Sequence, residues 1–173
     1  SGEGVALDAV RVDYAAGAVE AAVLRAAEGL PNQGLVLVEG QGSLCHPSST
    51  ATLPLLRGTQ PTALLLVHRA GQTSIDRLPH VPLPSLEALV ATTEALASWA
   101  RPDGAGKPAK VAAVALNTAR LDADQATVEI DRVSQTLGLP CTDPIRWGAE
   151  PLVKAVMNCL LYTSPSPRDS FRS

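Results

Sequence analysis

The stretch GLVLVEGQGSLCHP at residues 34–47 decides the fold class, because it joins a short apolar run to a glycine-rich turn that carries an acid. The run GLVLV at 34–38 is typical of a strand that is buried on both faces. Similar runs follow at 63–67 (ALLLV) and 110–116 (KVAAVAL), and Leu139–Thr142 forms a shorter extended piece. Four such runs separated by longer segments predict a mainly parallel sheet.

Helical patterns separate these apolar runs. Apolar residues at helical spacing predict helices at 13–28, around 51–57, at 85–100, at 122–137 and near 149–158. Ser85 is a candidate N-cap, Asp122 and Gln125 resemble a capping box, and Gly138 suits a helix end. Because helices and strands alternate, we predict an α/β fold in which helices flank a mainly parallel sheet.

Composition narrows the class of ligand. The chain has 173 residues, a net charge of −3, 46% hydrophobic residues and 18% charged residues, which suits one folded domain. Lys and Arg form no cluster, and no apolar run approaches the ~18 residues of a membrane span. The three cysteines are far apart in the sequence, so a disulfide framework or zinc site is unsupported and a cytoplasmic location is expected. We therefore expect a small-molecule substrate, with neither nucleic acid nor a membrane as partner.

Polar residues follow each of the predicted strands. In chain order these are Glu39, then His68 with Arg69, then Asn117 with Thr118, and finally Asp143. The carboxyl ends of parallel strands meet at one edge of a sheet, and ligands bind in the crevice there. We therefore expect these side chains to converge, although polar residues also occur at strand ends by chance.

The glycine-rich turn leaves two interpretations open. Glu39 can bind Mg²⁺ directly or through water, or it can cap the next segment in a plain strand-to-helix turn. Gly40 and Gly42 permit a positive φ or a close approach of the backbone. The turn matches neither GxGxxG nor a phosphate-binding GxxxxGK[ST] loop, and Gly106–Pro108 also fails the second pattern.

A family resemblance adds to these patterns. The stretches GVALDAVRVDYAAGAVE, LVEGQGSLCHP, LLRGTQPTALLLVHRAG, VAAVALNTARLD and GLPCTDPIRWG resemble the P-loop domain of the D-glutamate N-acetyltransferase-like family, from Gly4 to about Val156. The resemblance implies a P-loop NTPase-like fold and N-acetylation of D-glutamate or a similar amino acid by acetyl-CoA. The strand-Glu-Gly and strand-Asn elements are more distantly similar to dethiobiotin synthetase, which implies an ATP- and Mg-dependent ligase or carboxylase as the alternative.

The resemblance also implies catalytic roles. Glu39 matches the acid after the first strand and is assigned metal binding or general-base work. His46 matches the His-Pro of the same motif, and His68 matches the histidine after the second strand. An acceptor amine must lose a proton during acetyl transfer, and a neutral histidine near pH 7 suits that task. A structural role is the plain alternative for each histidine.

Binding roles follow from the same match. The residues assigned to the cofactor are Gly40, Gln41, Gly42, Ser43, Asn117 and Asp143. Ser43, Gln41 or the amides of Gly40 and Gly42 would donate to a developing oxyanion. Arg146 and Arg69 are assigned to a substrate carboxylate, because guanidinium binds carboxylates in a bidentate fork. The alternatives are a simple turn at Asp143 and a surface ion pair at Arg146.

The family resemblance and the tail sequence lead to expectations about the two ends of the chain. Family members have an N-terminal Rossmann-like domain and a strand with a phosphate-binding Gly-Lys-Thr/Ser loop and its following helix ahead of the matched region. We therefore expect residues 1–158 to be a partial P-loop-type domain, an internal fragment inactive by itself. The tail 159–173 (CLLYTSPSPRDSFRS) is expected to be disordered and not native, since CLLYTSPSPRDS looks like translated sequencing-adapter DNA. A third hypothesis is a silent half-domain that forms homo-oligomers through an unpaired sheet edge.

Overall fold

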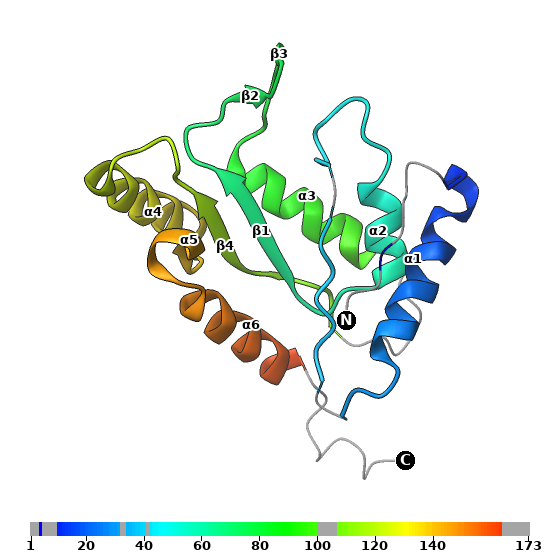
Figure 1. The fold of residues 1–173 in the computed structure, drawn as a ribbon. Helices are drawn as coiled ribbons and strands as arrows, with labels where there is room; N and C mark the ends of the chain where they lie inside the picture. Colours follow the sequence, from blue (N-terminus) through cyan, green and yellow to red (C-terminus); the bar gives the residue numbers. More distant parts are fainter. Residues whose placement is uncertain (1–3, 5–9, 32–33, 41, 100–106, 164–173) are drawn as a thin grey trace. The chain divides into compact units, whose positions relative to one another are not determined.

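In the computed structural model, helices separate the successive strands of a parallel sheet, as the sequence predicts (Figure 1). It describes residues 4, 10–31, 34–40, 42–99 and 107–163. The chain divides into two compact units, Ser1–Pro61 and Thr62–Ser173. Within the described residues, no helix is both long and apolar enough to cross a membrane.

The first unit is built from two packed helices, α1 (Val12–Ala27) and α2 (Thr52–Thr59). Both were predicted, and their contact buries Val19 of α1 and Leu56 of α2. Gly58 allows the close approach, because a Cβ at this position would lie 2.7 Å from the Cβ of Val19. A larger residue at position 58 would push the two helices apart.

The predicted strand at 34–38 is absent from the structure. Residues 34–40 adopt no regular secondary structure, and the side chain of Leu37 is 83% exposed. The prediction rested on an apolar run, which indicates what a segment would bury but not whether a neighbouring strand is there to pair with it. Among the described residues the parallel sheet therefore has three strands and not four.

The second unit contains this parallel sheet, in the order β1 (Leu64–Arg69), β4 (Val111–Asn117) and β5 (Cys141–Thr142). Leu64 of β1 lies opposite Val111 of β4, and their last residues, Arg69 and Asn117, are also partners. This parallel register brings the carboxyl ends of β1 and β4 to the same edge, as expected.

Helices cover both faces of the central strand β4 (Figure 1). Val114 and Leu116 point to one face, where they pack with Val133 of α4 (Ala123–Leu137) and with Leu86 of α3 (Leu86–Ser98). Ala113 and Ala115 point to the other face and pack against Leu152 of α6 (Glu150–Thr163). The alternation along β4 thus builds a core on each side and fixes the strand ends that carry the candidate site.

The predicted helix caps are confirmed. Ser85 accepts a hydrogen bond from the N–H of Ala88 at the start of α3. Asp122 and Gln125 form the capping box of α4, and Gly138 ends that helix with a φ of 64°. A left-handed φ is favoured by glycine, which explains the helix stop.

Three elements lie outside the predictions. The hairpin of β2 (Ser74–Ile75) and β3 (Leu78–Pro82) follows β1, and the short helix α5 (Pro144–Trp147) follows β5. Helix α6 also runs to Thr163, beyond the predicted end at residue 158 and into the predicted disordered tail. The next proline in the sequence after this helix is Pro165, and residues 164–173 lie outside the described residues.

Candidate functional site

A buried carboxylate joins the ends of β4 and β5. Asp143 is 3% exposed, and its Oδ2 accepts hydrogen bonds from the N–H and the hydroxyl of Thr118, at 3.0 and 2.5 Å. Its Oδ1 accepts from the N–H groups of Ile145 and Arg146 at 2.9 and 3.3 Å, which caps α5. Burial alone would raise the pKa of Asp143, but these hydrogen bonds outweigh it and hold the pKa below the ordinary value.

Arg146 contacts the same region, where its guanidinium group links α5 to the turn after β4. Its Nη2 donates to the carbonyl oxygens of Thr118 and Leu121, at 3.2 and 2.6 Å. Its Nε lies 3.9 Å from Oδ2 of Asp143, and its guanidinium sits 5.9 Å from the ring centroid of Trp147. Asp143, Thr118 and Arg146 form what we call the aspartate network.

Asn117 lies at the exposed end of β4, next to this network. Its Oδ1 accepts a hydrogen bond from the N–H of Ala119 at 3.0 Å, which fixes the orientation of the side chain. Its amide nitrogen has no acceptor among the residues that the structure describes. The amide of Asn117 is therefore oriented and available to a ligand at this edge.

His68 lines a cavity of about 340 Å³ between the end of β1 and the helices α3 and α4. We call this cavity the histidine pocket; Glu87, Glu129 and Arg132 are among its other lining residues. Burial lowers the pKa of His68, and the nearby Glu129 opposes that shift without reversing it. The imidazole of His68 is therefore neutral at pH 7 and able to accept a proton.

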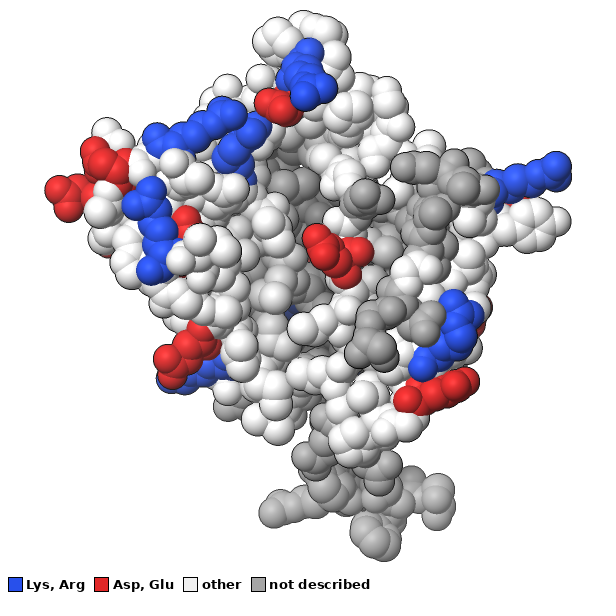
Figure 2. Space-filling view, in the orientation of Figure 1, with Lys and Arg blue, Asp and Glu red and all other residues white. Residues whose placement is uncertain are grey.

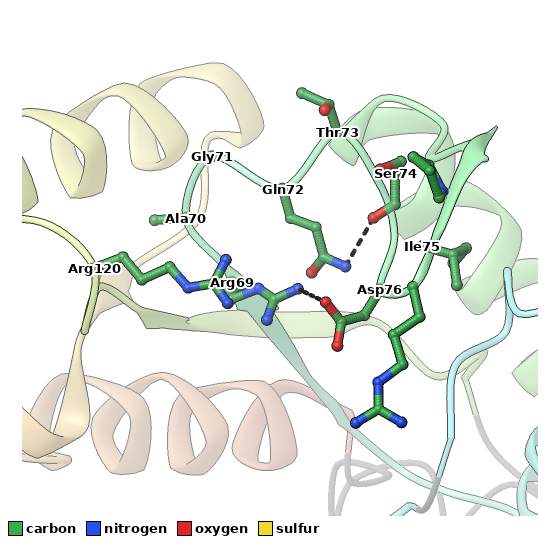
Figure 3. Close-up of a pocket in the computed structure, with 11 residues that line it drawn as sticks. Arg69, Ala70, Gly71, Gln72, Thr73, Ser74, Ile75, Asp76 and Arg120 are labelled. Carbon is green, nitrogen blue, oxygen red and sulfur yellow. Dashed lines mark hydrogen bonds and ion pairs between the residues drawn. The ribbon is translucent and has the colours of Figure 1, made fainter.

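A second cavity of about 230 Å³ lies beyond the end of β1 (Figure 3). Arg69, Asp76, Arg77 and Arg120 supply its charged side chains, and we call it the arginine pocket. Nη2 of Arg69 lies 3.4 Å from Oδ1 of Asp76. Figure 3 shows the side chains of Arg69 and Arg120 both reaching toward the middle of this pocket, one from β1 and the other from the turn after β4.

The glycine-rich turn belongs to the first unit. Gly42 has a φ of 86°, which favours glycine, whereas a Cβ on Gly40 would meet only the Cδ2 of Leu55 at 2.8 Å, the end of a side chain that can move. Nδ1 of His46 accepts a hydrogen bond from the N–H of Ser48 at 3.1 Å. Ser43 Oγ accepts from the N–H of Cys45 at 3.2 Å, whereas Gln41 lies outside the described residues.

The structure brings together the predicted residues of the second unit. The strand ends place Arg69, Asn117 and Asp143 along one edge of the sheet, and Arg146 joins Asp143 there. Convergence of Glu39 and His46 with this edge stays a prediction, because they belong to the first unit.

A resident metal ion is usually held by several protein side chains that lie close together. No three His, Cys, Asp or Glu side chains gather in the parts of the chain that the structure covers. Mg²⁺ binding by Glu39 therefore rests on that one carboxylate. Burial raises the pKa of the neighbouring Cys45, so its thiol stays protonated at neutral pH and is a poor nucleophile.

Four residues in the aspartate network and the arginine pocket had no role predicted from the sequence. Thr118 and Arg120 both lie in the stretch NTAR after the third predicted strand, so their position after a strand was a usable signal. Asp76 and Arg77 had no such signal, because the hairpin turn lacks the Asn-Gly or Asp-Gly pair that marks tight turns. Arg77 instead adopts a φ of 62°.

The parallel sheet with helices on both faces defines an α/β domain, and polar residues lie along the carboxyl edge of its sheet. The family model described as "Domain of unknown function (DUF1611_C) P-loop domain" matches residues 1–153. The chain belongs to this DUF1611 family of P-loop domains.

Two curated relatives carry the name D-glutamate N-acetyltransferase. The one from a Pseudoalteromonas species is 36% identical over 154 residues, or 88% of this chain, and the one from Tritonibacter scottomollicae is 38% identical over 157 residues, or 90%. The crystal structure of a DUF1611 family protein from Anabaena variabilis is 52% identical, covers 90% of this chain and superposes with a TM-score of 0.82. This chain spans 44% of the length of each of these three proteins.

Proposed function

We propose that this chain is the P-loop-type part of an N-acetyltransferase that transfers the acetyl group of acetyl-CoA to the amine of D-glutamate. The observation that carries the proposal is the match over about nine-tenths of the chain to two relatives with that name. The chain spans 44% of their length, so the proposed activity is that of a whole protein of that size, and we expect the chain alone to be inactive.

His68 is the proton acceptor in this proposal. The acceptor nitrogen attacks the thioester carbonyl carbon, an N–C bond forms and the C–S bond breaks. The nitrogen then loses a proton to become the amide, and the departing sulfur takes up one, so that coenzyme A leaves as its thiol. The ammonium form of the acceptor must first give up a proton, and His68 takes it because burial keeps its imidazole neutral. No described residue forms a hydrogen bond with the His68 side chain, which leaves the ring nitrogens to the reactants.

His46 suits a different role, that of a donor. Because its Nδ1 accepts from the N–H of Ser48, the neutral ring carries its proton on Nε2. That N–H is a donor that a bound ligand of the glycine-rich turn could use. The hydroxyl of Ser43 offers a second donor in the same turn, since its Oγ already accepts from Cys45.

The carboxyl edge of the sheet would receive the nucleotide part of the cofactor. The side chain of Asn117 is oriented by its bond to Ala119 and offers its amide N–H groups to a base edge. Asp143 contributes by holding Thr118 and Arg146 in place, since both of its oxygens already accept hydrogen bonds from the protein. We therefore assign Asp143 a positioning role.

Thiol release from acetyl-CoA tests the proposal. The protein for this test is a whole-length chimera, in which this chain replaces the segment of the Pseudoalteromonas relative that it matches. We expect thiol release that depends on D-glutamate, little with L-glutamate, and none with the chain alone. Absence of D-glutamate-dependent thiol release from a folded chimera would overturn the proposed function.

An ATP- and Mg²⁺-dependent ligase or carboxylase is the second candidate, and the available amide of Asn117 favours it as much as it favours coenzyme A. The same chimera separates the two. ADP formation that requires Mg²⁺ and is lost in Glu39→Ala supports the ligase. Thiol release without ATP supports the acetyltransferase.

A further inference from the structure

The arginine pocket concentrates positive charge in an acidic protein. Its lining includes three arginines, Arg69, Arg77 and Arg120, against one acid, Asp76, whereas the whole chain has a net charge of −3. On the face drawn in Figure 2 the charged side chains stand in small groups, separated by uncharged surface. The side chains that line this cavity of about 230 Å³ therefore carry a net charge of +2, which would attract an anion.

The positive charges of the pocket come from three separate segments. Arg69 ends β1, Arg77 lies in the turn between β2 and β3, and Arg120 lies in the turn after β4. Arg69 is held by Asp76 at 3.4 Å. Arg120 makes no hydrogen bond or ion pair with the residues described, so its guanidinium is available to a ligand.

Backbone conformation at the pocket also points to binding. Arg77 has a φ of 62°, a region that costs free energy for any residue with a Cβ, and glycine would adopt it at no such cost. The long charged side chain at this position is therefore not explained by the turn itself. It does supply one wall of the arginine pocket.

The distribution of the donors favours two carboxylates over one phosphate. Phosphate sites commonly use the N-terminus of a helix, and none of the residues lining this pocket belongs to the first turn of a helix. Guanidinium groups spread over three segments suit two singly charged groups joined by a short chain.

We propose that the arginine pocket binds the two carboxylates of an acidic amino acid, the acceptor of the acetyl group, with Arg120 and Arg77 as its principal ligands. The identification of this amino acid as the acceptor rests on the proposed function, whereas binding of an acidic amino acid does not. The loop residues Gly71, Gln72 and Thr73 line both this pocket and the histidine pocket, so a bound acceptor lies beside the cavity that holds His68.

Calorimetric titration of D-glutamate into the full chain tests the proposal. We expect saturable binding that weakens by about tenfold or more in Arg120→Ala, because a charge-assisted hydrogen-bonded pair is lost. Arg57→Ala is the matched control, since Arg57 is an exposed arginine of α2 outside the pocket, and we expect its affinity to equal that of the wild type.

Arg77→Gly separates ligand binding from folding. This change removes the guanidinium and relieves the unfavourable φ, so we expect weaker D-glutamate binding together with an unchanged or higher melting temperature. A merely structural role for Arg77 would produce the reverse pattern, a lower melting temperature with unchanged affinity, and that result would overturn its part in the site.

Three results would overturn the site as a whole: no binding of D-glutamate by the wild-type chain, equal affinity in Arg120→Ala, or loss of coenzyme A binding alone in that variant. Failure of the proposed function is distinguishable from these. If the chimera releases no thiol from acetyl-CoA while D-glutamate binding still depends on Arg120, the site stands and the acetyltransferase proposal fails.

Discussion

The two ends of one sheet edge differ in how their charges are used. In the aspartate network, past β4 and β5, the carboxylate of Asp143 is 3% exposed and accepts four hydrogen bonds. In the arginine pocket, past β1, Asp76 is 67% exposed and pairs with Arg69, while Arg120 pairs with no described residue. The first arrangement is satisfied from within the protein, and the second has charge left over for a ligand.

This difference separates stability from binding along a single edge. A buried carboxylate with all its hydrogen bonds made contributes to folding and has little left to offer a ligand. An exposed, incompletely neutralised cluster contributes little to folding, because surface charges are well solvated. Replacements in the aspartate network should therefore change stability, and replacements in the arginine pocket should change affinity.

The largest effect is expected from Asp143→Ala. The change leaves the N–H groups of Thr118, Ile145 and Arg146 without their acceptor, so we expect the free energy of unfolding to fall by about 3–5 kcal/mol. Urea denaturation measures it. Asp122→Ala is the control, because Asp122 caps an exposed helix start, and its cost should be about 1 kcal/mol. Equal costs for the two variants would contradict a special role for the aspartate network.

His68→Asn should lower kcat/KM of the chimera by about a hundredfold, since the proton acceptor is lost. Because burial lowers the pKa of His68 below 6.5, we expect the wild-type rate to fall only when the pH drops below 6.5, where the imidazole becomes protonated. The rate–pH profile measures both. His80, exposed on β3, provides the control, and its replacement by Asn should leave the profile unchanged. Persistence of the acid limb in His68→Asn would remove His68 from the reaction.

A smaller effect concerns acid stability. Because the folded pKa of Asp143 lies below its usual value of 3.8, its contribution is present above that value and is lost as the pH falls through the folded pKa. As the pH falls below 3.8, the wild type should therefore lose more stability than Asp143→Asn, whose side chain does not titrate. Thermal melting across this range measures the difference, and parallel curves for the two proteins would argue against it.

The sequence was most informative where local chemistry decides the structure. Caps at Ser85 and Asp122 and the turn at Gly138 were predictable, because each needs only its near neighbours in the chain. The edge position of Arg69, Asn117 and Asp143 was predictable for a related reason, since parallel strands end at one edge.

What was missed depends on contacts between distant segments. The strand expected at 34–38 needed a pairing partner that an apolar run does not reveal. The arginine pocket joins Arg77 and Arg120, which are far apart in the sequence, and the left-handed φ of Arg77 hides the hairpin from turn patterns. The use of Asp143 as an internal acceptor could be suspected from its place before Pro144, but not its pairing with Thr118.

The most direct test is the KM for D-glutamate of the chimera that carries Arg120→Ala, with Arg57→Ala beside it. We expect a KM raised by about tenfold or more in Arg120→Ala, with kcat, the KM for acetyl-CoA and the melting temperature close to those of the wild type. An unchanged KM for D-glutamate, or a rise in the KM for acetyl-CoA instead, would contradict the assignment of the arginine pocket to the acceptor.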